Sequence, residues 1–352
     1  MKVIKFLFSF VLGSVIIASC AKINEEDNEK DPTIPINPIS PDSTYVSMGI
    51  GGEFVASPLS KAGSSNDLFA VNVRRVDSNG QFSTVSNYAY GVFDDIGKAV
   101  FKLAKRYYYA FEVACIPNGK NVLYKYREGV YGVPCYSVED GYAEVNKIVY
   151  SSNSALCIGT NDAQDRNHSQ YQARYNEWSP IERYQGVCAR FDPNTSDNVV
   201  VDLYRQMVGF TITIEDFTSG TVTIHGMCED AHRYSVSAVP GQNKQVLKAV
   251  FESPTMPYIG KGEFPINIIE ASEEEIKQYE YDITNFGENQ VYIRYSDGES
   301  KDIILYYRFD FKFQRNTNYS LTFSLSDAIA NGGISVNLVD EGDEMNNLPF
   351  EL

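Results

Sequence analysis

Apolar residues recur at every second position along most of this chain, and this period limits what it can fold into. One run contains Val208, Phe210, Ile212 and Ile214. Because successive side chains of a β-strand point to opposite faces of a sheet, each such run predicts a strand with one face in a core. Comparable runs are Tyr45 to Ile50; Phe69, Val71 and Val73; Tyr107, Tyr109, Phe111 and Val113; Ile303, Leu305, Tyr307, Phe309, Phe311 and Phe313; and Tyr319, Leu321, Phe323 and Leu325. The sequence therefore predicts an all-β fold.

Helical signals are scarce. Ser272 followed by Glu275 forms a capping box ahead of Ile276 and Tyr279. In a capping box the serine and the acid satisfy each other's backbone N–H groups at the start of a helix. One short helix is predicted there.

The first nineteen residues have the composition of an export signal. Basic Lys2 and Lys5 precede thirteen mostly apolar residues, Phe6 to Ala18. A helix needs about 20 residues to cross a bilayer, so this run is typical of a cleaved signal peptide. The sequence Ile17-Ala18-Ser19-Cys20 resembles a bacterial lipobox, which makes Cys20 the predicted lipidation site and anchors the protein to the outer membrane. A soluble secreted protein with an incidental cysteine is the alternative.

Residues 20–43 predict a solvated tether. Glu25 to Asp31 is charged and Thr33 to Ser43 contains three prolines, with no hydrophobic period to bury. Such composition does not form a core. An acidic cluster behind a lipidated cysteine resembles the surface-export signal of Gram-negative anaerobes, whereas a plain periplasmic linker would have the same composition.

The length and the net charge of the chain limit the number of domains and the class of partner. Without residues 1–19 the chain of 352 residues has 333, which suggests about two domains, and its 28 basic against 46 acidic groups give a formal charge of −18. That sign argues against nucleic acid as a partner. Turn-forming residues from Asp192 to Asp197 separate two strand-like runs. We predict two tandem antiparallel β-sandwiches, residues 44–196 and 197–352.

Chemistry-bearing residues are few. Cys115, Cys135, Cys157, Cys188 and Cys228 are odd in number and contain no CxxC pair, which excludes a full disulfide framework. His225, Cys228 and His232 form H-x2-C-x3-H, but structural zinc sites usually need four ligands. His168 has no adjacent nucleophile pattern. We predict no catalytic residues, no metal and no cofactor.

Three parts of the chain, residues 201–214 with 220–226, residues 315–323 and residues 60–71, resemble fimbrillin-like lipoproteins, the subunits and anchors of type V pili. Residues 201–214 with 220–226 resemble the opening of the second domain in that family, and residues 315–323 resemble its close. Ser60-Lys61-Ala62 before Asp67 to Val71 resembles the entry strand of the first domain. The resemblance implies two transthyretin-like sandwich domains and a non-enzymatic role in adhesion as a fimbrial subunit, anchor or accessory protein.

In that family, polymerising subunits are thought to lose an N-terminal strand by cleavage after arginine, and a strand of another subunit fills the groove. This chain has no arginine between Cys20 and Arg74, so Lys61 is its candidate processing site. Without cleavage the subunit would keep its first strand and its lipid, as an anchor would. At the other end, Ile334, Val336 and Leu338 alternate and form a candidate donor strand; the alternative is that they close their own sandwich.

The long segment Thr160 to Gly186 is the best candidate for a contact surface. It contains Tyr171, Tyr175, Trp178 and Tyr184 among several arginines. Aromatic and arginine side chains in a loop can bind a host or bacterial surface ligand, or can simply cap the first sandwich. A glycan-binding lipoprotein of a polysaccharide-uptake system is therefore the alternative function.

Overall fold

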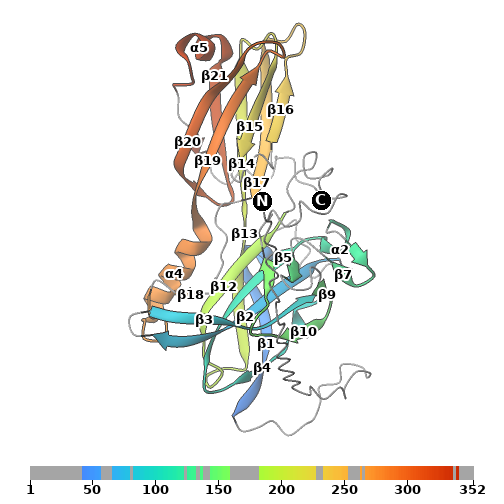
Figure 1. Cartoon of the computed structure of the whole chain (residues 1–352), viewed down its shortest axis with the longest axis vertical. Coiled ribbons are helices and arrows are strands. Elements are labelled where there is room, and N and C mark those ends of the chain that lie inside the picture. The colour runs from blue at the N-terminus through green and yellow to red at the C-terminus, as the bar shows by residue number, and fades with distance from the viewer. Residues whose placement is uncertain are drawn as a thin grey trace, which may run out of the picture. The chain divides into compact units, whose positions relative to one another are not determined.

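The computed structural model describes residues 42–56, 66–79, 82–122, 125–131, 135–137, 143–158, 182–226, 233–252, 262–263, 266–335 and 338–340. All of them lie in one compact unit, Ser40–Leu352. Strands dominate this unit and most pairings are antiparallel, so the prediction of an all-β fold is confirmed (Figure 1). No helix among the described residues is long and apolar enough to cross a membrane.

A nine-stranded sheet, called here the first sheet, contains most of the N-terminal half. Its strand order is β10-β3-β2-β5-β12-β13-β1-β4, and β18 pairs with β3 off this path. All pairings in it are antiparallel except that of β1 with β13. The strands are β1 (Ser43–Gly52), β2 (Leu68–Asn79), β3 (Phe82–Phe93), β4 (Phe101–Ala104), β5 (Tyr108–Ile116), β10 (Lys147–Tyr150), β12 (Tyr184–Phe191), β13 (Asn198–Arg205) and β18 (Gly262–Glu263).

Two small sheets and three short helices accompany the first sheet. The sheets have the orders β11-β8 and β6-β7-β9. Their strands are β6 (Lys125–Arg127), β7 (Val130–Tyr131), β8 (Cys135–Ser137), β9 (Ala143–Glu144) and β11 (Leu156–Ile158), and the helices are α1 (Glu53–Ala56), the 3-10 turn η1 (Ile96–Lys98) and α2 (Gly119–Val122).

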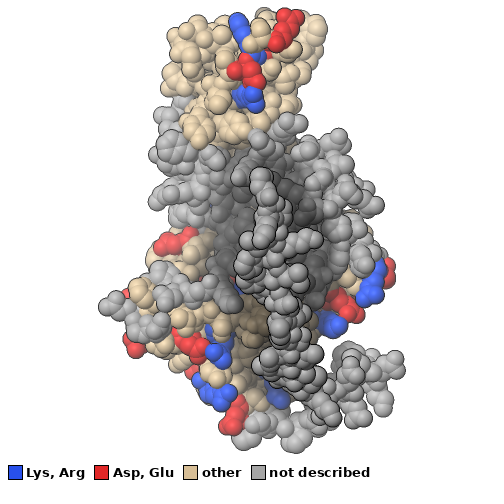
Figure 2. All heavy atoms as spheres, viewed as in Figure 1, with Lys and Arg blue, Asp and Glu red and all other residues tan. Residues whose placement is uncertain are grey.

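Two four-stranded sheets, called here the second sheet pair, contain the C-terminal half. Their orders are β17-β14-β21-β22 and β16-β15-β19-β20. The elements are β14 (Met207–Glu215), β15 (Thr221–Gly226), β16 (Arg233–Ser237), β17 (Lys244–Glu252), β19 (Phe286–Ser296), β20 (Asp302–Gln314), β21 (Thr317–Ser324), β22 (Val339–Asp340), α4 (Glu273–Asn285) and α5 (Leu325–Asn331). On the face drawn in Figure 2, the described part of this half has few charged side chains, and both signs occur together.

The alternating apolar residues form two separate main cores. The first contains Val71 and Phe111 of the first sheet together with Val46 of β1. The second contains Phe210, Leu321 and other residues from both sheets of the second pair, so these two sheets pack face to face on one core. The period-2 pattern therefore identified the inward faces correctly for most strands.

The turn at Asp192–Asp197 is not a boundary between sheets, which corrects the prediction. It joins β12 to β13, and these strands pair in the first sheet, with Tyr184 opposite Arg205. Val199, Val201 and Leu203 of β13 belong to the first core. A hairpin turn and a linker use the same residue types, so composition could not distinguish them. The number of domains stays a prediction.

Two further expectations about the C-terminal strands are wrong in detail. The alternation from Ile303 to Phe313 is broken by register shifts in β20, so Leu305 and Tyr306 are both buried while Tyr307 is 51% exposed. A β-bulge adds a residue to one strand and so reverses the faces beyond it. Leu325 does not continue β21 but begins α5, capped by the Ser324 hydroxyl.

Candidate functional site

Strand β1 is the first described strand, and it connects two others. Its residues 43–46 pair antiparallel with β4, from Ser43 opposite Ala104 to Val46 opposite Phe101. Its residues 47–52 pair parallel with β13, from Ser47 opposite Asn198 to Gly52 opposite Leu203. The expected strand at Tyr45 to Ile50 is thus confirmed, and its backbone is hydrogen-bonded along its whole length.

The inward side chains of β1 complete the first core. Val46 is fully buried, Met48 is 5% exposed, and Ile50 packs against the same cluster. Gly52 has φ of 74°, and a Cβ there would lie 2.7 Å from the Leu203 carbonyl oxygen. Only glycine meets both demands without strain, so the sequence at the end of β1 is fixed by the close approach of β13.

Helix α1 follows β1 and adds another buried side chain to the first core. The Phe54 ring is fully buried and packs edge-on against Phe69 at 5.9 Å and Tyr184 at 5.3 Å between ring centroids. Burying an aromatic side chain contributes about 1.5–3 kcal/mol. The segment from Ser43 to Phe54, named here the N-terminal plug, is therefore part of the core although it stands at the beginning of the described chain.

Three tyrosine hydroxyls occupy the edge of β4 that faces away from β1. Tyr88 donates to the Lys102 carbonyl oxygen at 2.7 Å, and Tyr150 accepts from the Lys102 N–H at 2.8 Å. The Tyr109 hydroxyl accepts from the Ala104 N–H at 3.0 Å. Burial raises the pKa of the Tyr88 and Tyr109 phenols. Because these side chains use the groups that another strand would need, β4 does not offer a free edge for strand addition.

The carboxylate of Glu53 joins the N-terminal plug to the second sheet pair. Nη1 of Arg315 lies 2.7 and 2.8 Å from its two oxygens. Oε2 also accepts from the Arg205 N–H at 3.1 Å, and the Arg315 guanidinium lies over the Tyr204 ring at 4.5 Å. The Arg315 side chain is only 9% exposed. The plug is therefore held by an ion pair as well as by its core contacts.

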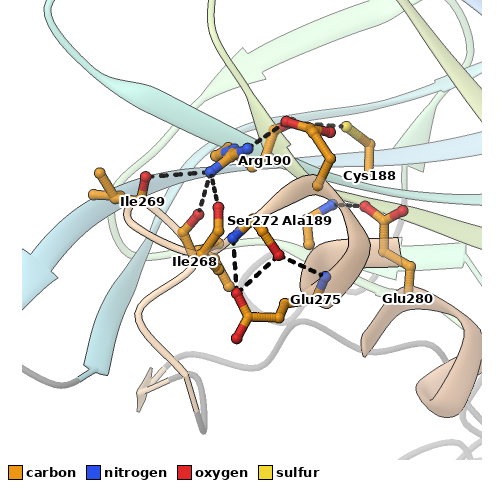
Figure 3. A network of polar contacts seen from close by, with 10 residues as sticks. Cys188, Ala189, Arg190, Ile268, Ile269, Ser272, Glu275 and Glu280 are labelled. Carbon is orange, nitrogen blue, oxygen red and sulfur yellow. Dashed lines mark hydrogen bonds and ion pairs between the residues drawn. The ribbon is translucent and has the colours of Figure 1, made fainter. Parts of the chain in front are cut away.

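Helix α4 forms a second connection between the two halves (Figure 3). Nη1 of Arg190 in β12 donates to the carbonyl oxygens of Ile268, Ile269 and Ala271 at 3.0, 3.2 and 2.8 Å. The Glu280 carboxylate accepts from the Ala189 N–H at 2.6 Å, within the bulge of β12. Burial raises the pKa of Glu280. These contacts fasten α4 to the first sheet.

Helix α4 also covers apolar residues of the first sheet. Ile268 and Ile276 pack with Val187, Ala189 and other residues of that sheet. Ser272 and Glu275 make the reciprocal bonds of the predicted capping box, which confirms the predicted helix. The stretch from β18 to α4 thus packs on the first sheet although it lies beyond residue 197, where the second sandwich was predicted to begin.

The structure describes only some of the residues singled out in the sequence. Cys20, Lys61, Tyr171, Tyr175, Trp178 and Val336 lie outside the described residues. Tyr184 is not in a loop: it lies in β12, is 2% exposed and donates to Glu182 at 3.2 Å, so its assignment to a contact loop was wrong. Its ring packs in the first core instead.

The candidate donor residues at the C-terminal end contact their own core. Ile334 and Leu338 pack against the second core, and the Ile334 N–H donates to the Leu305 carbonyl oxygen at 2.6 Å. Val339–Asp340 then forms β22 beside β21. In this structure the segment closes its own sheet pair, the alternative weighed from the sequence.

His225 is a buried strand residue, 6% exposed, and its ring stacks on Tyr292 at 4.3 Å. Cys228 and His232 lie outside the described residues, where the metal pattern cannot be followed. Within the described ranges, no group of three His, Cys, Asp or Glu side chains is arranged to hold a metal ion.

Sequence reasoning missed Glu53, Arg315 and the tyrosine hydroxyls on β4. The only signal for Glu53 was its position directly after Gly51-Gly52 at the end of an alternating run. Arg315 lies in the segment that resembles the close of the second domain, and Tyr109 in an alternating apolar run. Their partners are far away in the chain, Arg315 being 262 positions from Glu53, so no local pattern could pair them.

No protein-family model matches the chain, and no curated protein matches it in sequence. Solved structures give distant likenesses in fold. They include a candidate polysaccharide-binding protein of Bacteroides thetaiotaomicron, at 10% identity over 85% of this chain and 96% of that one, with a TM-score of 0.37.

Two proteins of Porphyromonas gingivalis are also similar. The fimbrial anchor protein Mfa2 is 8% identical over 85% of this chain and 94% of its own, with a TM-score of 0.32. The tip fimbrial protein Mfa3 is 9% identical over 85% and 98%, with a TM-score of 0.28. All three similarities are distant.

Proposed function

We propose that this chain is a non-enzymatic surface lipoprotein of a fimbrial assembly, built by strand complementation and contributing to adhesion. The observation that carries the proposal is the N-terminal plug. A strand at the start of the folded chain fills a slot between β4 and β13 and completes the first core. Such a strand can be replaced by one of the same pattern from another chain, because its neighbours do not depend on its covalent connection.

The surroundings of the slot support this use. If β1 left, the β13 backbone and the core beneath Val46 and Met48 would be exposed to water. The outer edge of β4 is already occupied by tyrosine hydroxyls. An incoming strand would therefore be directed to the position of β1 rather than beside β4.

Within that assembly we favour an anchor or accessory role. The plug fills its own slot, and no arginine lies between Cys20 and Arg74 to direct arginine-specific cleavage. A subunit that keeps its own strand cannot receive another, so it would end an assembly rather than extend it. The lipid on Cys20 would hold that end at the outer membrane, and Lys61 is the position where processing would convert the chain to a polymerising subunit.

Peptide exchange tests strand complementation. In the mature chain, residues 59–64 are replaced by a specific protease site, and a fluorescent peptide of residues 43–56 is added before and after cleavage. The peptide should enter only the cleaved chain, and a peptide with Val46→Asp should not enter at all because it would bury a charge. A cleaved chain that never exchanges its strand would contradict the proposal.

The membrane address is tested separately. Palmitate should label the full-length chain expressed in a bacterium that makes lipoproteins, and Cys20→Ala should abolish both the label and membrane fractionation. Unchanged labelling of the variant would remove Cys20 as the anchor. Polysaccharide binding that is lost with Trp178→Ala would favour the glycan-binding alternative instead.

A further inference from the structure

Arg315 occupies a fixed position beside the end of the N-terminal plug. It forms a turn with Asn316 between β20 and β21, and Asn316 has φ of 53°. The Asn316 N–H donates to the Met207 carbonyl oxygen at 2.6 Å, and the Thr317 hydroxyl donates to the Arg315 carbonyl oxygen at 3.2 Å. The turn is thus attached to the start of β14, which follows β13 after one residue.

The surroundings of the guanidinium favour a carboxylate. One face lies on the Tyr204 ring, and Nη1 contacts both oxygens of Glu53. The side chain is 9% exposed, so little water can solvate it. A buried guanidinium that loses its acid partner is left as an uncompensated buried charge, which is costly because water cannot solvate it fully.

We propose that Arg315 selects the strand that occupies the β1 slot by requiring a carboxylate directly after the glycine that ends the strand. This inference rests on the proposed strand complementation. The accepted strand has two apolar residues where Val46 and Met48 lie, a glycine at the position of Gly52 and an acid at that of Glu53. The occupant with this pattern is a second copy of this segment, residues 43–56 of another molecule of the chain.

The selection has a structural consequence. The carboxylate is carried by the occupant of the first sheet, whereas the guanidinium belongs to the second sheet pair. A strand that lacks the acid can still bury its apolar residues in the first core, but it leaves the β20–β21 turn without its ionic contact. The first core thus recognises the apolar side chains of the strand, and Arg315 of the second sheet pair recognises its carboxylate.

The test uses the cleavable mature chain with two fluorescent peptides of residues 43–56, one unchanged and one with Glu53→Gln. We expect the unchanged peptide to bind roughly tenfold more tightly, because the Glu53→Gln peptide leaves the buried Arg315 guanidinium without its acid, while the 37% exposure of Glu53 limits the effect. A chain with Arg315→Gln should bind both peptides alike. The matched control is Arg294→Gln, which removes an arginine paired with Asp302 on the surface of the same half and should keep the preference.

The outcomes separate this inference from the function on which it rests. If both peptides enter the unchanged chain with equal affinity, Arg315 does not select and the inference fails, while strand complementation stands. If neither peptide enters, strand complementation itself fails. Should the Arg315→Gln chain not fold, Arg315→Lys replaces it: a preference reduced several-fold supports the inference, and an undiminished preference overturns it.

Discussion

The two halves of the molecule each contain one parallel strand pair in otherwise antiparallel sheets, β1 with β13 and β21 with β14. Strand β13 and strand β14 follow each other in the chain and are separated only by Gln206. Strand β21 is joined by the turn at Arg315 to β20 and runs directly into α5, so the chain holds it at both ends. Strand β1 is held covalently only through the segment that contains Lys61 on its C-terminal side. Under the proposed strand complementation, the same local geometry is permanent in one half and exchangeable in the other.

The two strands also differ in how much they bury. Six residue pairs join β1 to β13, whereas eight join β21 to β14. Tyr319, Leu321 and Phe323 of β21 lie in the second core, against Val46 and Met48 of β1 in the first. Phe54 adds the third large side chain of the plug, from helix α1 rather than from the strand. The N-terminal plug therefore consists of a strand followed by one buried aromatic side chain, Phe54.

The sharpest way to break this comparison is to place a charge in each strand. Leu321→Asp should abolish cooperative folding, because burying an unpaired carboxylate in the second core costs several kcal/mol and β21 cannot leave. Val46→Asp should displace the plug while most of the chain stays folded. Circular dichroism melting and limited proteolysis will distinguish the two variants. Loss of all folded structure in Val46→Asp would mean that β1 is as indispensable as β21.

Glycine substitutions measure how tightly β13 holds the plug. Gly52→Ala combines φ of 74° with a Cβ 2.7 Å from the Leu203 carbonyl oxygen, and we expect a loss of about 2–3 kcal/mol in the free energy of unfolding. Gly298→Ala is the matched control, since its φ is 84° but its Cβ would have nothing within 4 Å. It should cost only about 1–2 kcal/mol. Equal losses of unfolding free energy in denaturant melts would indicate that the β13 backbone moves away from the added Cβ at no cost.

Tyr109→Phe tests whether the tyrosine hydroxyls hold β4 independently of β1. The variant leaves the half-buried Ala104 N–H without its partner, and we expect a loss of about 1 kcal/mol, at the low end of the cost of an unsatisfied buried group. Hydrogen exchange at Ala104 should become faster, while exchange in β21 should be unchanged. An unaltered rate at Ala104 would show that the hydroxyl does not seal this edge.

The smallest expected effect concerns the α4 attachment, whose hydrogen bonds do not involve the N-terminal plug. Burial raises the pKa of Glu280, so the folded chain holds that proton more tightly than the unfolded chain. Stability from this group is therefore greatest at low pH and falls as the pH rises from the ordinary value of a glutamate through the raised one. Glu280→Gln should flatten this part of the stability profile measured by denaturant melts between pH 4 and 7. An identical profile in the variant would contradict the assignment.

Local patterns predicted local structure well. Val208 to Ile214 face the second core as their spacing requires, and Ser272 with Glu275 marks the start of α4. The same kind of pattern failed where a distant strand changed the geometry. The bulges in β20 are imposed by its pairing with β19, so the faces of Tyr306 and Tyr307 could not be assigned from spacing alone. The segment Asp192–Asp197 was predicted to be a boundary between domains because a turn between paired strands has the same composition.

The sequence by itself determined the all-β class, the inward faces of most strands and the capped helix, since these depend on residues within a few positions of one another. It also supplied the hypothesis of an exported, lipidated chain. Only the tertiary structure decided that β1 lies between β4 and β13, that α4 packs on the first sheet and that Arg315 meets Glu53. Contacts between residues about 60 to 262 positions apart depend on the whole fold, and neither residue carries a local signal of its partner.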